Sequence, residues 1–243
     1  MSALAAPENI VLLHGFGGTR RMWDGVVARL EPERYLALAL DLPGHGAESG
    51  APRPISFAGC VRHVLAHSPA RFVLGGYSMG GRVALQVALH APQRVQRLVL
   101  VASTAGIEDA AERASRRNSD ERLAEQLQRE PLQRFAERWS EQPLFATDHP
   151  DVRAAALEDQ LRNQPDGLAA ALRGVGTGAM EPLWDRLAEL TLPVTVLVGD
   201  RDVKFQELGR RLAQSLPTAE LSVVAGGHRL ALENPAAVAR ALM

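Results

Sequence analysis

The sequence predicts an α/β fold in which a mostly parallel sheet carries helices on both faces. Short apolar runs alternate along the chain with segments of helical periodicity. Strands are expected at 9–13, 35–40, 71–75, 97–102, 193–198 and 220–224. Helices are expected between them at 20–30, 56–67, 80–91, 206–216 and 235–242. Runs this short and continuously apolar are typical of strands buried on both faces of a parallel sheet, joined by right-handed crossovers.

The alternation stops between residues 106 and 190, a stretch rich in Arg, Glu, Gln and Ala. In a helix, five apolar residues of this stretch would lie largely on one side: Leu123, Leu127, Leu132, Phe135 and Trp139. We expect one discontinuous core domain, residues 1–105 and 191–243, and an all-helical insertion at 106–190. Ligands bind at the carboxyl ends of the strands in such sheets, so the insertion is expected to form a lid there. The alternative is an appendage that only adds bulk.

The composition is that of an ordinary globular protein, with 46% hydrophobic and 23% charged residues among 243. This excludes a disordered chain and a collagen-like repeat. The 27 basic and 28 acidic residues give a net charge of −1. No charge excess therefore indicates nucleic acid or an anionic membrane as a partner. Cys60 is the only cysteine, which excludes a disulfide within the chain.

No apolar run approaches the roughly 20 residues that a membrane-spanning helix needs. The first eight residues lack the basic start and apolar core of a secretory signal. We therefore expect a cytoplasmic protein without membrane insertion. The sequence predicts no oligomeric state.

A G-x-S-x-G motif, Gly76-Tyr77-Ser78-Met79-Gly80, lies directly between a predicted strand and a predicted helix. Its glycines permit the strained turn that raises the serine above the sheet. We therefore predict Ser78 as the catalytic nucleophile. The alternative is a glycine-rich turn with an incidental serine.

A catalytic acid and a base are expected after later strands. Two acidic candidates, Asp200 and Asp202, follow the fifth predicted strand, and His228 follows the last one. We favour Asp202 because it lies further into its loop, where it can face the histidine. His228 would accept the Ser78 proton, while Asp202 would fix the tautomer of the imidazole and stabilise the imidazolium.

An oxyanion hole requires two backbone N–H donors. One is expected from Met79, directly after the nucleophile and at the start of its helix. The other is expected from the loop after the first strand, at residues 14–18, where we predict Phe16.

Arg82 lies four residues after Ser78 and therefore on the same face of the following helix. Because an unpaired buried charge is costly, an anionic partner is predicted, either a substrate carboxylate or a carboxylate of the protein. Further arginines in the insertion indicate, on their own, a solvated helix face: Arg113, Arg116, Arg117 and Arg162. His63 and His67 have a spacing that a metal could use, but no third ligand is evident and no metal is predicted.

These residues lie in segments that resemble the α/β-hydrolase superfamily across nearly the whole chain. More narrowly, the chain resembles the 2-succinyl-6-hydroxy-2,4-cyclohexadiene-1-carboxylate (SHCHC) synthases of menaquinone biosynthesis. The resemblance is carried by LHGFGGTRRMW (13–23), DLPGHG (41–46), GYSMGGRVAL (76–85), ERASRRNSDERLA (112–124), PLQRFAERWSEQPLF (131–145), LRNQPDGLAAALRGVGTG (161–178) and GDRDVKF (199–205). The first two segments are common to many α/β-hydrolases, whereas the insertion segments and GDRDVKF are more specific.

The resemblance implies an α/β-hydrolase fold with a helical lid after the strand that follows the nucleophile helix, and a lyase activity. SHCHC synthases eliminate pyruvate from 2-succinyl-5-enolpyruvyl-6-hydroxy-3-cyclohexene-1-carboxylate, a tricarboxylate, and cleave no ester. Ser78, activated by His228 and Asp202, would remove a ring proton. The donors at Phe16 and Met79 would stabilise the enolate-like charge that results. Neither a metal nor an organic cofactor is implied.

The resemblance also implies which residues contact the substrate. Five correspond by motif position to the family's carboxylate-binding arginines and pocket aromatics: Arg82, Arg116, Arg162, Tyr77 and Trp139. At Ala231 this chain departs from relatives that carry a histidine, a change that bears on substrate preference.

Two other functions use the same residues. A carboxylesterase, thioesterase or C–C bond hydrolase would employ the same triad, but a neutral ester gives no reason for Arg82 beside Ser78. A non-catalytic binding protein would not need an intact Ser-Asp-His set with both oxyanion positions. The sequence therefore favours the lyase, with the hydrolase as the alternative.

Overall fold

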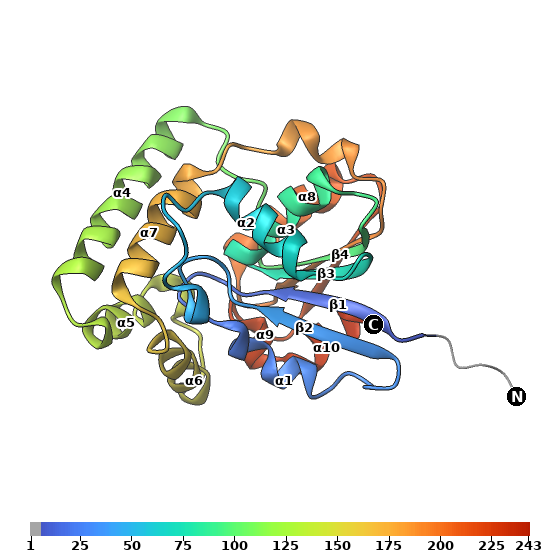
Figure 1. Ribbon diagram of the computed structural model, residues 1–243, viewed down its shortest axis with the longest axis horizontal. Helices are drawn as coiled ribbons and strands as arrows, with labels where there is room; N and C mark the ends of the chain where they lie inside the picture. Colours follow the sequence, from blue (N-terminus) through green and yellow to red (C-terminus); the bar gives the residue numbers. More distant parts are fainter. Residues whose placement is uncertain (1–5) are drawn as a thin grey trace, which may run out of the picture.

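The computed structural model describes residues 6–243, in which six strands form one sheet (Figure 1). Residues 1–5 lie outside the described residues; they belong to the segment in which the sequence shows no secretory signal. The strands are β1 (Glu8–Leu13), β2 (Tyr35–Leu40), β3 (Phe72–Tyr77), β4 (Val95–Val101), β5 (Val194–Gly199) and β6 (Ala219–Val224). They are ordered β2-β1-β3-β4-β5-β6, and every neighbouring pair is parallel. The predicted α/β fold with a parallel sheet is confirmed.

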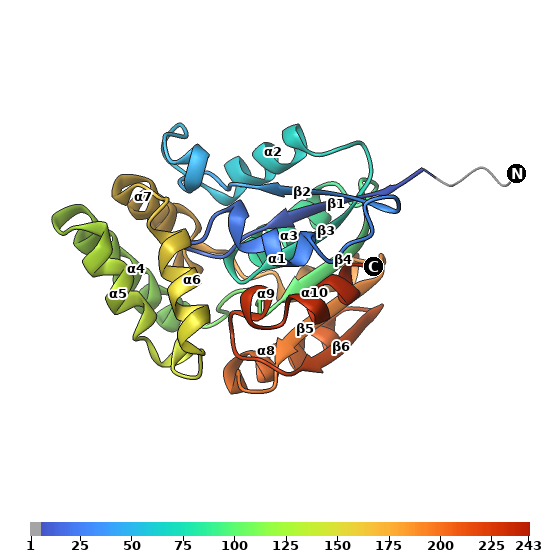
Figure 2. The same ribbon diagram turned by 90° about the horizontal axis from the view of Figure 1, so that it is seen from below.

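Helices cover both faces of this sheet (Figure 2). One face carries α2 (Phe57–His67), α3 (Met79–His90) and α8 (Val203–Ser215). The other carries α1 (Asp24–Val27), α9 (Leu230–Glu233) and α10 (Pro235–Leu242). The helix expected at 20–30 is shorter than predicted, because a 3-10 turn (Arg20–Trp23) capped by the Thr19 hydroxyl precedes the single turn of α1.

The prediction that the strands are buried on both faces holds for the centre of the sheet and is wrong for its edges. All six residues of β3 are buried. In the edge strand β2, by contrast, Leu36 and Leu38 are exposed, and β6 contains no fully buried residue. An edge strand has a neighbour on one side only, so the helices that cover the sheet do not reach all of its side chains.

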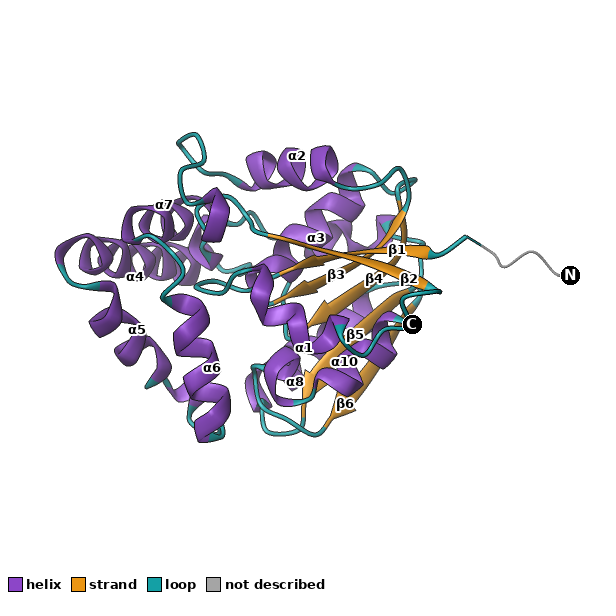
Figure 3. Cartoon of the chain, turned by 60° about the horizontal axis from the view of Figure 1, so that its bottom comes forward, coloured by secondary structure: helices purple, strands orange, loops and turns teal. Residues whose placement is uncertain are grey.

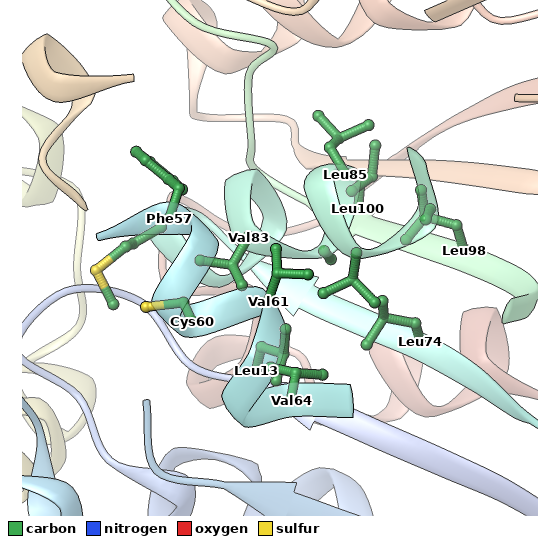
Figure 4. Packing of buried hydrophobic residues seen from close by; sticks show 14 of the residues in the cluster. Leu13, Phe57, Cys60, Val61, Val64, Leu74, Val83, Leu85, Leu98 and Leu100 are labelled. Carbon is green, nitrogen blue, oxygen red and sulfur yellow. The ribbon is translucent and has the colours of Figure 1, made fainter. Parts of the chain in front are cut away.

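The larger of the two core layers lies between the sheet and helices α2 and α3 (Figure 4). Val61 and Val64 of α2 lie close to Val83 of α3 and to Leu13 at the end of β1, and Cys60 belongs to the same cluster. Burying these side chains provides about 25 cal/mol for each Å² of apolar surface removed from water. This packing fixes α3, whose first turn follows Ser78.

Four longer helices lie between β4 and β5 in the chain: α4 (Ala110–Arg129), α5 (Leu132–Ser140), α6 (Pro150–Gln160) and α7 (Pro165–Val175). We call residues 106–190 the helical insertion. The strands point toward these four helices, which lie beyond the carboxyl ends of the sheet (Figure 3). A separate cluster that includes Leu127, Phe135 and Leu172 joins α4, α5 and α7. Within the described residues, no helix is long and apolar enough to cross a membrane.

Candidate active site

Ser78 occupies the sharp turn between β3 and α3. Its backbone has φ 50° and ψ −109°, a conformation that non-glycine residues rarely adopt. The turn is tight because α3 packs directly on the end of β1: a Cβ at Gly80 would overlap the carbonyl oxygens of Leu13 and His14. The Ser78 N–H donates to the Val101 carbonyl oxygen at 2.9 Å, which holds the turn against β4.

His228 lies between Ser78 and Asp202. Its Nδ1 is 2.7 Å from Oδ2 of Asp202, and both side chains are buried. Because a carboxylate only accepts hydrogen bonds, Nδ1 carries the hydrogen and Nε2 is left as an acceptor. Nε2 faces Oγ of Ser78 at 3.4 Å, slightly beyond the reach of about 2.6–3.2 Å at which a base takes a proton, so a small movement of the serine hydroxyl would complete the contact.

The structure separates the two acidic candidates. Asp200 is half-exposed; its carboxylate accepts the Gly226 N–H at 3.0 Å and lies 3.8 Å from Arg201. Asp202 is buried, and its carboxylate also accepts the Phe205 N–H at the start of α8. Of the two, only Asp202 contacts His228 in the described part of the chain.

Aromatic rings surround His228. The ring centroid of Phe205 lies 4.5 Å from the imidazole, that of Tyr77 lies 5.3 Å away and that of Phe145 lies 5.9 Å away. These rings limit water around the imidazole and restrict its rotation.

The two predicted oxyanion donors lie on either side of the nucleophile. Met79 begins α3, and a Cβ at Gly15, next to Phe16, would lie 3.5 Å from Cβ of Ser78. Over residues 6–243, neither the Phe16 N–H nor the Met79 N–H has a hydrogen-bond partner. Free N–H groups beside a serine in this position can stabilise negative charge on a bound oxygen.

A small cavity of about 50 Å³ opens beside this loop. It is lined from the core by Phe16 and Tyr77, from the insertion by Trp139 and Phe145, and from the loop after His228 by Arg229. The Phe16 and Trp139 rings meet edge to face, with centroids 4.9 Å apart. The cavity is therefore formed jointly by the core and the helical insertion.

The family model of the α/β-hydrolases matches residues 10–241. An SHCHC synthase from Salmonella agona is 34% identical over 238 residues, which cover 96% of this chain and 92% of the relative. A structure of MenH from S. aureus has a TM-score of 0.89 and 28% identity, and the match covers 96% of this chain and 91% of that one. A malate-bound esterase from Thermogutta terrifontis has a TM-score of 0.82 and 27% identity, covering 97% and 88% of the two chains.

The chain belongs to the α/β-hydrolase family and, within it, to the SHCHC synthases. The resemblance and the fold inferred from the sequence are thereby confirmed, as is the prediction that this protein is an enzyme.

In this member of the SHCHC synthases, Arg82 is buried and lacks a carboxylate partner among the residues that the structure describes. Its Nη1 donates to the Val175 carbonyl oxygen at 2.9 Å, and the guanidinium lies 5.9 Å from the centroid of the Phe57 ring. Burial lowers the pKa of Arg82, and the nearby Arg116 charge lowers it further. The sequence predicts that Arg82 pairs with a carboxylate either of the substrate or of the protein. Within residues 6–243, no protein carboxylate pairs with it.

The other two arginines of the SHCHC synthase pattern are already paired. Arg116 donates through Nε to Asp120 at 2.8 Å. Arg162, at the end of α6, is half-exposed; it contacts Glu158 at 2.6 Å and lies 3.9 Å from Asp159. Arg162 does not line the cavity beside Tyr77, whereas the predicted contacts Tyr77 and Trp139 both do.

Sequence reasoning missed a buried ion pair next to the triad. Arg229 follows His228 directly, contacts Asp148 at 2.5 Å and stacks on the Phe145 ring with its guanidinium 3.8 Å from the centroid. Burial raises the pKa of Asp148, whereas the Arg229 charge acts in the opposite direction. The position of Arg229 directly after the predicted catalytic histidine is the one signal in the sequence, but its partner lies 81 residues away in the chain.

The histidines outside the triad have structural contacts. Nε2 of His14 accepts the Leu42 N–H at 2.9 Å, so Nδ1 carries the hydrogen that it donates to the Gly15 carbonyl oxygen at 2.8 Å. Nε2 of His63 lies 3.0 Å from the Asp41 carbonyl oxygen, and Nδ1 of His67 lies 2.8 Å from the carbonyl oxygen of His63.

Proposed function

We propose that this chain is a lyase that eliminates pyruvate from 2-succinyl-5-enolpyruvyl-6-hydroxy-3-cyclohexene-1-carboxylate to give SHCHC in menaquinone biosynthesis. One observation carries the proposal beyond family membership: the buried Arg82, four residues after Ser78, has no carboxylate partner in residues 6–243. A buried guanidinium without a carboxylate partner, one helical turn after the predicted nucleophile, is best explained by an anionic substrate.

In the proposed reaction Ser78 is a base and forms no acyl-enzyme. His228 Nε2 takes the Ser78 proton while Asp202 stabilises the imidazolium. Ser78 Oγ then removes a ring proton, and the electron pair moves into an enolate-like arrangement with the succinyl ketone. The Phe16 and Met79 N–H groups stabilise the charge on the ketone oxygen. The electron pair returns to form the new ring double bond as the C–O bond breaks, and the leaving enolpyruvate acquires a proton and becomes pyruvate.

The three carboxylates of the substrate give the arginines their role in this proposal. Arg82 binds one of them from within the core, and Arg116 and Arg162 bind the others from the insertion. Guanidinium groups suit this task because they bind carboxylates through two parallel hydrogen bonds. Arg116 and Arg162 exchange part of their contacts with Asp120, Glu158 and Asp159 for the substrate.

We also propose that residues 106–190 act as a lid over the core formed by residues 1–105 and 191–243. Ligand pockets commonly measure about 300 Å³ or more, whereas the cavity here measures about 50 Å³. The insertion therefore moves away to admit the substrate and returns to exclude water.

The proposed reaction uses no cofactor. Because the substrate is a highly charged acid, we propose that the enzyme acts in the cytoplasm.

The alternative is a hydrolase, which the likeness to the malate-bound esterase keeps under consideration. The experiment incubates the purified chain with the enolpyruvyl substrate, follows pyruvate through lactate dehydrogenase and subtracts spontaneous elimination. A panel of neutral esters and thioesters is run in parallel. Rapid pyruvate release with feeble ester cleavage supports the lyase. Ester cleavage with no pyruvate above background, or an acyl-enzyme detected by intact mass, supports the hydrolase.

A further inference from the structure

Three residues at the end of α6 contact the loop that carries the predicted oxyanion donor Phe16. We call residues 15–19 the oxyanion loop. The Asp159 carboxylate accepts the Thr19 N–H at 2.8 Å and the Thr19 hydroxyl at 2.5 Å. Asn163 donates through Nδ2 to the Gly17 carbonyl oxygen at 2.9 Å. A Cβ at Gly17 would lie 3.0 Å from Nε2 of Gln160, so α6 packs closely on the loop.

Asn163 also connects this loop to a second loop of the core. Its Oδ1 accepts the Gly46 N–H at 2.9 Å, and its Nδ2 makes a further bond to the Gln160 carbonyl oxygen at 2.9 Å. Asp159 and Asn163 are both buried. Satisfied polar groups in a buried position fix the segments that they join, because breaking their bonds leaves them unpartnered.

The core itself holds both ends of the oxyanion loop: the Thr19 carbonyl oxygen at its far end accepts the Met22 N–H at 3.2 Å. The Gly17 carbonyl oxygen between the two ends is held by Asn163 from the insertion. At the near end the core fixes the first peptide. The Gly15 carbonyl oxygen accepts hydrogen bonds from the Gly18 N–H at 3.1 Å and from Nδ1 of His14 at 2.8 Å. Because the peptide unit is planar, these bonds also direct the Phe16 N–H, which belongs to the same peptide. The hydrogen bond from Gly18 to Gly15 requires the bend of the loop. Gly17 forms this bend with a φ of 76°, a conformation that glycine adopts readily.

We propose that Asp159 and Asn163 are positioning residues that hold the Phe16 N–H in register with Ser78, so that the oxyanion hole is complete only while α6 is docked. This inference rests on the roles proposed above for Ser78 and Phe16. It assigns the insertion a part in assembling the catalytic groups, in addition to covering them. An enzyme with its insertion displaced would keep its triad but would lose the bonds to Thr19 and Gly17 that hold the bend beside the Phe16 N–H.

The test uses variants that remove one or two hydrogen bonds with little change of shape. Asn163→Asp keeps the acceptor for Gly46 and removes the amide donor to the Gly17 and Gln160 carbonyl oxygens. Asp159→Ala removes both bonds to Thr19, whereas Asp159→Asn can restore them because an amide both accepts and donates. Asp151→Ala, on the same helix and exposed, is the matched control. If Asp159→Ala or Asn163→Asp fails to fold, Thr19→Val tests the contact from the loop side. It removes the hydroxyl bond to Asp159 together with the bond that caps the 3-10 turn, and it keeps the bond from the Thr19 N–H.

The readout that does not depend on the natural substrate is the rate at which an alkyl phosphonofluoridate labels Ser78, followed by intact mass. In that reaction the serine oxygen bonds to phosphorus, fluoride leaves, and the phosphoryl oxygen occupies the oxyanion hole. A displaced donor slows such steps by about 10- to 100-fold. We expect this loss in Asp159→Ala and Asn163→Asp, a smaller loss in Thr19→Val, and near-normal rates in Asp159→Asn and Asp151→Ala.

Pyruvate release provides the second readout. The same variants should lose kcat with little change in KM, because the oxyanion donor acts on the transition state rather than on substrate binding. Labelling at the wild-type rate in folded Asn163→Asp and Asp159→Ala would overturn the inference, as would a rise in KM at constant kcat. If wild-type protein released no pyruvate but the variants still labelled slowly, the positioning role would stand and the proposed function would fail.

Discussion

Arg82 on the nucleophile helix α3 donates a hydrogen bond to the carbonyl oxygen of Val175, the last residue of α7, at 2.9 Å. This bond connects α3 to the insertion and satisfies one of the five N–H groups of the guanidinium. A neutral carbonyl does not balance the charge, and burial lowers the pKa of Arg82. The folded protein therefore carries an electrostatic cost that a bound carboxylate would relieve.

The first prediction is that Arg82→Met separates activity from stability. A hydrogen bond to a charged group contributes about 1.5–3 kcal/mol, so kcat/KM for pyruvate release should fall by about 10- to 100-fold. Removing an unpaired buried charge should leave the free energy of unfolding unchanged or higher. Steady-state kinetics and urea unfolding measure the two quantities. Arg122→Met, on the exposed face of α4, is the control and should change neither. Unchanged kcat/KM in Arg82→Met would point to a hydrolase of neutral substrates.

The second prediction concerns the buried ion pair of Arg229 and Asp148. Removing one partner leaves the other charge buried, so Arg229→Met should lower the free energy of unfolding by about 3 kcal/mol or more. The double variant Arg229→Met with Asp148→Leu should lose less than the sum of the single changes, in a double-mutant cycle by urea unfolding. Arg186→Met removes an exposed pair with Glu189 and should cost under about 1 kcal/mol. Strict additivity of the two buried changes would contradict this interpretation.

The third prediction concerns pH and the buried imidazole of His45. Burial lowers its pKa well below the usual value, and the neighbouring His14 charge lowers it further. The unfolded chain therefore binds a proton below about pH 6.5 that the folded chain does not, and the unfolding free energy falls as pH decreases through this range. His45→Gln removes this titration and should flatten the fall between about pH 6.5 and 5. Urea unfolding at several pH values measures the unfolding free energy of both proteins. If it fell equally steeply with decreasing pH in the wild type and in His45→Gln, His45 would not be buried in its neutral form.

The fourth prediction is that Cys60 reports opening of the core. Burial raises the pKa of this thiol to about 12, and it packs between α2 and the sheet. Because the thiolate is the reactive form, labelling by Ellman's reagent at pH 8 should be at least about 1,000-fold slower than in urea-unfolded protein. Labelling of the native protein as fast as that of the unfolded chain would mean that α2 does not cover the cysteine.

Much of the site could be predicted because its determinants are local. The sharp turn at Ser78 depends on glycines within two residues of it, and Gly80 is required by the close approach of α3 to β1. The choice of Asp202 over Asp200 followed from the length of one loop, and the structure has His228 in contact with Asp202.

The parts that could not be predicted depend on residues distant in the chain. Nothing near Arg82 in the sequence indicates that its partner is the Val175 carbonyl, 93 residues further on. The Asp148 partner of Arg229 and the Asp159 contact with Thr19 require the insertion to fold back over the strand ends. Arg162 was assigned from family resemblance alone, and in the structure it pairs with Glu158 away from the cavity. Periodicity locates helices but does not say which loop each one will contact.

In the proposed reaction Ser78, paired with His228, removes a ring proton so that pyruvate is eliminated. The most direct measurement is the initial rate of pyruvate formation by wild-type protein, Ser78→Ala and Asp202→Asn, with the spontaneous rate subtracted and folding verified by circular dichroism. We expect rapid release by the wild type, a fall to near background in Ser78→Ala, and a large loss in Asp202→Asn from the altered histidine tautomer. Release by Ser78→Ala at a rate close to wild type would contradict the proposed reaction.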